Sequence, residues 1–129
     1  MTPVVLDASA GVELALKTPV GRRLDTQMPG DATIWVPEHF YAESAAVLRR
    51  LALTQQTAPA RVEVALTRLL STPSRQVAVK PLLVEAWTHR HNLADALYVV
   101  LARHLNGLLV TADRRLANAP GLPVRAITP

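Results

Sequence analysis

Short apolar segments alternate along the chain with longer segments in which apolar residues recur at helical spacing. The short segments are typical of buried strands, and they are Pro3–Asp7, Thr33–Val36, Gln76–Val79, Leu108–Thr111 and Val124–Thr128. Strands separated by helices favour parallel pairing with helical crossovers. The pattern therefore predicts an α/β fold with a central parallel sheet of about five strands, flanked by helices on both faces.

Proline, glycine and small polar residues mark the predicted helix boundaries. Ser9 suits an N-cap, Pro37 suits a first helical turn, and Gly107 suits the residue after a helix end. With these boundaries the predicted helices are Ser9–Lys17, Val20–Thr26, Pro37–Leu53, a helix from Pro59 through Leu70, Pro81–His91, Leu93–Asn106 and a short turn from Asp113.

Length and composition narrow the class of protein. The chain has 129 residues, half of them hydrophobic, which fits one domain spanning residues 1–129. The absence of cysteine excludes disulfides and metal sites built on sulfur. No apolar run reaches the ~20 residues that a membrane span needs, and Asp7 and Glu13 interrupt the apolar start of the chain. We therefore expect a soluble, cytoplasmic protein.

Three acidic residues fall where the carboxyl ends of the predicted strands meet, and a fourth lies on a helix. Asp7 ends the first strand, Asp113 follows the fourth, and Asp95 lies in the first turn of the helix before that strand. Glu43 lies within the long helix, with Phe40 and Val47 as neighbours at helical spacing. In open α/β sheets this edge is where ligands bind.

Each acid also has a purely structural interpretation. Asp7 and Asp113 could cap the helices that follow them, and Asp95 could favour a helix N-terminus. A salt bridge to Arg49 or Arg50 could compensate Glu43. If the four carboxylates converge, however, they repel one another unless a cation joins them. Magnesium or manganese suits an all-oxygen cluster, and such a site can activate water and neutralise a phosphate.

Four motifs in order resemble the PIN-domain ribonucleases of the VapC type, the toxins of VapBC toxin–antitoxin pairs. The motifs are LDAS at Leu6–Ser9, VPEHFYAE at Val36–Glu43, NLADALYV at Asn92–Val99 and LVTADRRL at Leu109–Leu116. The resemblance covers nearly the whole chain. It implies a five-stranded parallel sheet, an acidic Mg²⁺ site, hydrolysis of RNA, a homodimer and inhibition by a cognate VapB antitoxin.

The resemblance also assigns residues to the site. It makes Asp7, Glu43, Asp95 and Asp113 the catalytic and metal-binding quartet, and it matches Ser9 and Thr111 to hydroxyls that support that site. Two departures stand out. Asn92-Leu93-Ala94 runs directly into Asp95, where family members often have about two more residues, and no further acid follows Asp113. We therefore expect one metal held by the protein, with another arriving with the substrate.

The basic residues suggest how a polyanion could be held. The formal net charge is +4, and a basic balance is typical of proteins that bind nucleic acid. Arg114 and Arg115 follow Asp113 directly, while Arg49 and Arg50 share the helix of Glu43. We expect Arg114, Arg115 and Arg50 to contact RNA, although solvated helix faces would account for them equally well.

Other functions fit the same residues less well. A catalytically idle PIN-fold module that binds RNA or protein would not need the complete quartet. A phosphate-accepting receiver domain needs paired acids after the first strand and a lysine after the last, whereas this chain has a lone Asp7 and ends in Arg125-Ala-Ile-Thr. A DNA-cutting nuclease remains possible from the residues alone. The function expected is that of a Mg²⁺-dependent endoribonuclease toxin.

Overall fold

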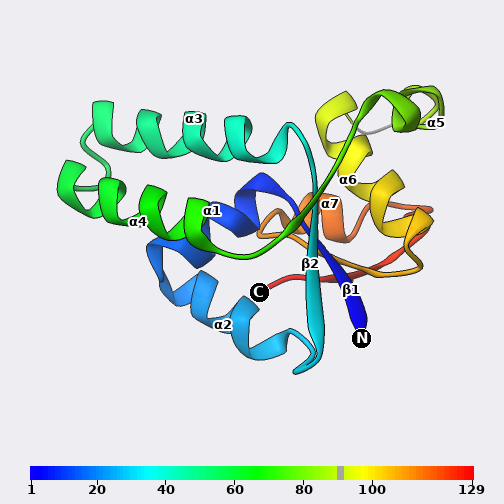
Figure 1. Cartoon of the computed structure of the whole chain (residues 1–129), viewed down its shortest axis with the longest axis horizontal. Coiled ribbons are helices and arrows are strands. Elements are labelled where there is room, and N and C mark those ends of the chain that lie inside the picture. The colour runs from blue at the N-terminus through cyan, green and yellow to red at the C-terminus, as the bar shows by residue number, and fades with distance from the viewer. Residues whose placement is uncertain (90–91) are drawn as a thin grey trace.

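The computed structural model describes residues 1–89 and 92–129, and in that part of the chain five strands form one parallel sheet (Figure 1). The strand order is β3-β2-β1-β4-β5. The bounds are Thr2–Leu6 for β1, Ala32–Pro37 for β2, Arg75–Val77 for β3, Leu108–Val110 for β4 and Arg125–Ile127 for β5. The predicted α/β fold with a parallel five-stranded sheet is confirmed.

The central strand β1 pairs on both sides, which fixes where the strand order reverses. Val5 lies opposite Trp35 of β2 and opposite Leu109 of β4. The chain builds β2 and β3 on one side of β1, and then crosses to add β4 and β5 on the other. The crevice beyond the carboxyl ends of β1 and β4 is therefore the switch point at which α/β sheets bind ligands.

Helices cover both faces of the sheet. In Figure 1, α1 to α4 lie on one side of β1 and β2, and α5 and α6 lie on the other. Every residue of α6 from Ala96 to Ala102 is buried, so this helix forms the centre of the core on its side. The bounds are Ala8–Leu16 for α1, Pro19–Gln27 for α2, Phe40–Leu53 for α3, Pro59–Ser71 for α4, Leu83–Trp87 for α5, Leu93–His104 for α6 and Arg114–Ala117 for α7.

None of the helices in residues 1–89 and 92–129 is long and apolar enough to cross a membrane.

The start of α1 corrects the prediction that Ser9 caps this helix. Asp7 is the N-cap residue, and its carboxylate accepts a hydrogen bond from the backbone N–H of Ala10 at 2.9 Å. The Ser9 hydroxyl instead contacts Asp7 and the backbone N–H of Ala112. The capping interpretation of Asp7 is thus correct, and it leaves Ser9 available to join two segments that are far apart in sequence.

The long helix starts at Phe40, three residues later than predicted. Pro37 is the last residue of β2 and pairs with Val77, and the N–H of Glu38 extends that pairing by bonding the Val77 carbonyl at 2.8 Å. The side chain of Glu38 accepts the N–H of Val79. The prediction that Pro37 and Glu38 occupy the first helical turn was therefore wrong, because Pro37 belongs to the sheet and the N–H of Glu38, in the turn that follows, still bonds to β3.

The segment predicted as one helix over Pro81–His91 is broken. A 3₁₀ turn at Lys80–Leu82 leads into α5, which ends at Trp87. The N–H and the hydroxyl of Thr88 both bond the Glu85 carbonyl. Such a side-chain bond competes with helical pairing and favours termination. The end of the predicted helix at His91 lies outside the described residues.

Gly107 has a different role from the one predicted. Asn106 adopts the left-handed backbone after α6, with φ of 50°, so that conformation does not require Gly107. At Gly107 a Cβ atom would lie 2.5 Å from the carbonyl oxygen of Pro3. The glycine is needed because the backbone entering β4 passes directly against the backbone of β1.

Candidate active site

Asp7 lies at the carboxyl end of β1 and is held from three directions. The residue is buried, with 4% of its surface exposed. Beyond the Ala10 N–H at one carboxylate oxygen, the Ser9 hydroxyl donates to that same oxygen at 2.7 Å, and the Thr111 hydroxyl donates to the other. These bonds fix the rotamer of a carboxylate that points out of the sheet edge.

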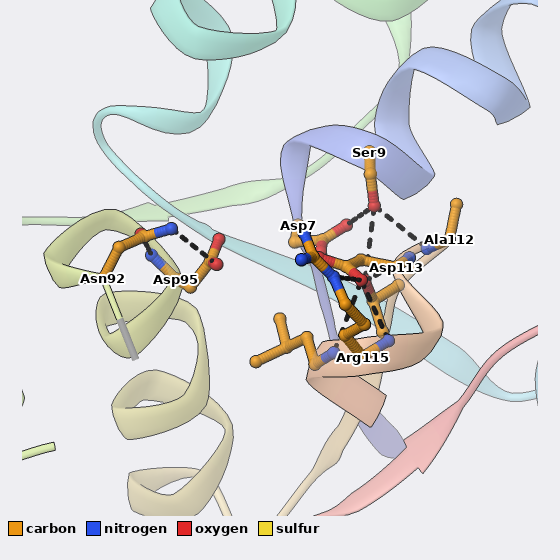
Figure 2. Close-up of polar contacts among 9 residues, drawn as sticks. Asp7, Ser9, Asn92, Asp95, Ala112, Asp113 and Arg115 are labelled. Carbon is orange, nitrogen blue, oxygen red and sulfur yellow. Dashed lines mark hydrogen bonds and ion pairs between the residues drawn. The ribbon is translucent and has the colours of Figure 1, made fainter. Parts of the chain in front are cut away.

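Ser9 and Thr111 join the two central strands around Asp7. Their hydroxyl oxygens are 3.3 Å apart, Ser9 accepts the N–H of Ala112, and Thr111 accepts the N–H of Asp113. Figure 2 shows Ser9 between Asp7 and Ala112. The predicted supporting hydroxyls therefore lie against Asp7, and they tie the position of Asp113 to it.

Asp113 caps α7, as its structural interpretation required. One carboxylate oxygen accepts the N–H of Arg115 at 2.9 Å and that of Leu116 at 3.4 Å. The guanidinium of Arg115 is 3.9 Å from the same oxygen, but its side chain is 96% exposed, so this pair contributes little. Capping employs one oxygen of Asp113 and does not prevent the carboxylate from facing the pocket described below.

Asp95 is held at the start of α6 by a reciprocal pair of bonds with Asn92. The Asn92 side-chain oxygen accepts the Asp95 N–H at 2.8 Å, and the Asn92 amide donates to the Asp95 carboxylate at 2.8 Å. This pair is a variant of the capping box. Figure 2 shows it at the N-terminus of α6, across from Asp7 and Asp113. Asn92 was not singled out as a site residue from the sequence, although it stands within the NLAD motif.

Glu43 reaches the same region from the first turn of α3. The hydroxyl of Tyr98 on α6 donates to its carboxylate at 3.0 Å. Among the described residues, no ion pair joins Glu43 to Arg49 or Arg50. The structural alternative in which arginine compensates Glu43 is therefore wrong, and its partner is a buried tyrosine that the sequence reasoning missed.

The four predicted acids line a single cavity of about 460 Å³, together with Glu13. Arg50 is the only basic side chain along the described lining of this cavity. Arg114 and Arg115 are exposed on α7 and are not among the residues of its wall. We call this cavity, with Asp7, Glu43, Asp95 and Asp113 in its wall, the acidic pocket.

Burial and neighbouring negative charges shift the pKa of two groups at the pocket, the Asp7 carboxyl and the Tyr98 hydroxyl. Burial raises the pKa of the Asp7 carboxyl above its usual range and the Asp95 charge raises it further, although the hydrogen bonds from Thr111, Ala10 and Ser9 oppose this. Burial and the charge of Glu43 also raise the pKa of the Tyr98 hydroxyl far above its usual range, so Tyr98 remains a donor. Burial and the neighbouring carboxylate therefore both disfavour ionisation of Asp7 in the pocket.

The donor set of the pocket fits a hard divalent cation. The four predicted acids and Glu13 all offer oxygen atoms, and magnesium binds such ligands while keeping several waters. Across residues 1–89 and 92–129, no three His, Asp or Glu side chains are arranged to hold one ion directly.

A family model of the PIN domain matches residues 4–122. Ribonuclease VapC12 of Mycobacterium tuberculosis is 38% identical over 120 residues, which cover 92% of each chain. This chain belongs to the VapC family of PIN domains. Ribonuclease VapC3 of the same organism is 36% identical over 118 residues, covering 90% of this chain and 86% of that one.

Solved VapC structures share the fold. The crystal structure of Mycobacterium tuberculosis VapC20, described as a toxin that cleaves the sarcin-ricin loop, superposes with a TM-score of 0.64 at 20% identity and covers 95% of this chain and 98% of that one. VapBC2 from Rickettsia felis, solved with a promoter DNA fragment, gives a TM-score of 0.60 at 14% identity and covers 98% of both chains. These structures share the fold, and the family model together with the 38% identity to VapC12 confirms the predicted VapC resemblance.

Proposed function

We propose that this chain is a metal-dependent endoribonuclease that hydrolyses RNA phosphodiester bonds and acts as the toxin of a type II toxin–antitoxin pair. The observation that carries the proposal is the convergence of Asp7, Glu43, Asp95 and Asp113 on one pocket at the switch point of the sheet. The VapC relatives, which are named ribonucleases, support the same activity.

Each acid has a role that its position suggests. Asp7, Asp95 and Asp113 would hold Mg²⁺ or Mn²⁺, directly or through water, and Glu43 would hold the ion or orient the attacking water. When bound, the cation would neutralise charge on the phosphate and lower the pKa of coordinated water. Ser9 and Thr111 keep the Asp7 carboxylate in one orientation, so the pocket is ordered before substrate arrives.

The charge distribution favours a polyanionic substrate. With four acids assigned to the pocket, the 14 basic residues outnumber the remaining acids of the 10 in the chain by more than two to one. A basic surface attracts RNA, whereas the acidic pocket repels its phosphates until a cation is present. We therefore propose cytoplasmic RNA as the substrate class.

A second cavity suggests where an antitoxin would bind. It measures about 410 Å³, lies between α1, α2, α3 and α4, and includes Leu14 and Phe40 in its largely apolar wall. Three of the four charged residues that line it are basic, namely Lys17, Arg22 and Arg68. We propose that an apolar segment of a VapB-type antitoxin with acidic side chains occupies it. Formation of a homodimer stays a prediction.

Sequencing RNA ends after expression of the protein without an antitoxin tests the proposed function. We expect new ends at a small number of positions with the wild-type chain, and none above background with Asp7→Asn. RNA binding without new ends would instead favour the catalytically idle PIN-fold module.

Arg50 is predicted to bind a substrate phosphate, because it is the basic residue in the described wall of the acidic pocket. Glu43, Val47 and Arg50 share one face of α3 and all three line the pocket. We expect Arg50→Ala to raise KM for RNA several-fold with kcat nearly unchanged, and to reduce the slope of log binding constant against log salt by about 0.7 per lost contact.

Arg49→Ala is the matched control for this prediction. Arg49 is the preceding residue of α3, is exposed and lies outside the wall of the pocket. Equal effects of the two substitutions on KM and on the salt slope would mean that α3 contributes only diffuse positive charge, and would contradict a phosphate contact at Arg50.

A further inference from the structure

The Tyr98 hydroxyl is the one described side-chain group that hydrogen bonds Glu43. We propose that Tyr98 is a positioning residue for the reaction: it holds one Glu43 carboxylate oxygen and leaves the other to face the cation and the attacking water. This proposal rests on the proposed function, since it gives Tyr98 a part in the same site. Tyr98 acts through Glu43 and does not itself contact substrate.

A core position alone does not account for this tyrosine. Tyr98 is fully buried, in a stretch of α6 whose other members from Ala96 to Ala102 are apolar. A phenylalanine would fill the same volume. A buried hydroxyl is costly unless it is hydrogen bonded, and here its bond goes to an acid of the pocket. The polar atom is therefore explained by Glu43 rather than by packing.

Glu43 needs such a partner more than the other acids do. Backbone N–H groups hold Asp7 and Asp113, and the Asn92 amide holds Asp95. Glu43 is longer, projects from within a helix and receives no backbone N–H at its carboxylate among the described contacts. A free glutamate samples many rotamers, so the Tyr98 bond selects the one in which Glu43 lines the pocket.

The tyrosine ring is itself fixed against the start of α3. The rings of His39 and Tyr98 pack at 4.8 Å between centroids, with 41° between their planes. The His39 carbonyl accepts the backbone N–H of Glu43 at 3.0 Å. The residue that supports the Tyr98 ring thus also holds the backbone of Glu43, which makes the three residues one unit that joins α3 to α6.

Tyr98→Phe tests the proposal, with Tyr41→Phe as its matched control. The Tyr41 hydroxyl bonds Ser74 and lies outside the acidic pocket. We expect Tyr98→Phe to lower kcat and the calorimetric affinity for Mn²⁺ by about 10-fold or more, with KM for RNA little changed. Tyr41→Phe should change neither quantity. In a Glu43→Gln background, Tyr98→Phe should cause no further loss, because the two residues act together.

An NMR measurement on the wild-type chain tests the proposal even if Tyr98→Phe folds poorly. The chain has two tyrosines, so labelling tyrosine with ¹³C at Cζ gives two NMR signals, which Tyr41→Phe assigns. We expect Mg²⁺ to move the Tyr98 signal and leave the Tyr41 signal in place. Glu43→Gln should move the Tyr98 signal and abolish its response to Mg²⁺.

The outcomes separate this proposal from the proposed function. A Tyr98 signal indifferent to both Mg²⁺ and Glu43→Gln, or additive losses in the double variant, would overturn the positioning role. If wild-type protein cuts RNA while Tyr98→Phe matches it in kcat and Mn²⁺ affinity, only this proposal fails. If the Tyr98 NMR signal responds to Mg²⁺ through Glu43 but no RNA is cut, the proposed function fails, while the coupling of Tyr98 to the cation through Glu43 is supported.

Discussion

Asp7→Asn is expected to reduce RNA cleavage by about 10³-fold or more, which corresponds to roughly 4 kcal/mol of transition-state stabilisation. Asp7 is the most buried of the four acids, and its carboxylate lies at the switch point between β1 and β4. Replacing it with a neutral amide removes one of the negative charges that we propose to hold the cation. Cleavage of a labelled RNA by purified protein, in the presence of Mg²⁺, measures the effect.

The same substitution should leave the fold intact. Asparagine can still accept the Ala10 N–H and cap α1, and the Thr111 hydroxyl can turn from donor to acceptor. Because burial raises the pKa of Asp7, its ionisation opposes folding of the metal-free protein as pH rises through the folded-state pKa. In EDTA at pH 7 we therefore expect the Tm of Asp7→Asn to equal or exceed that of wild type.

The role of Asp7 in the active site requires that Asp7→Asn loses RNA cleavage and also keeps its Tm. Loss of cleavage together with a large fall in Tm would show that Asp7 is mainly a helix cap. Retention of cleavage by a folded Asp7→Asn protein would remove Asp7 from the site altogether.

Gly107→Ala is expected to destabilise the protein by about 1–3 kcal/mol, because the added methyl group overpacks a tight contact. That contact is with the backbone carbonyl of Pro3 in β1, which cannot move without disturbing the pairing of β1 with β4. For a domain of this length the loss corresponds to a fall in Tm of roughly 4–12 °C. Thermal unfolding followed by circular dichroism measures it.

Gly30→Ala is the matched control for this substitution. Gly30 is exposed, and a Cβ atom there would meet nothing within 4 Å. Its Tm should stay close to that of wild type. Equal Tm values for Gly107→Ala and wild type would show that β1 and β4 can separate slightly without cost, and would contradict the tight approach.

Much of the fold could be predicted because it follows from the spacing of hydrophobic residues and from the order of strands and helices along the chain. The five short apolar runs became the five strands, and the helical spacing between them required crossovers and hence parallel pairing. The boundaries at Pro37 and Thr88 were less predictable. Each depends on a hydrogen bond, from Glu38 to Val77 or from Thr88 to Glu85, that competes with helical pairing and leaves no periodic signal.

The four acids and the supporting hydroxyls of Ser9 and Thr111 could be predicted from the sequence, whereas the supports at Asn92 and Tyr98 could not. Asp7 directly follows β1 and Asp113 stands three residues after β4, so their convergence follows from the parallel sheet. The cap at Asp7, rather than at Ser9, depends on backbone angles that composition does not reveal. Tyr98 was missed because a tyrosine in an apolar helical run indicates only a core residue. A usable signal was its spacing, since it stands one helical turn after Asp95 and so shares that face of α6.

The central claim is that the acidic pocket uses a divalent cation to hydrolyse RNA. The most direct test incubates the purified, antitoxin-free protein with RNA in Mg²⁺, in EDTA, and in EDTA followed by excess Mg²⁺. The account predicts cleavage in Mg²⁺, none in EDTA and recovery when Mg²⁺ is restored. Undiminished cleavage in EDTA, or intact RNA in Mg²⁺ with folded wild-type protein, would contradict it.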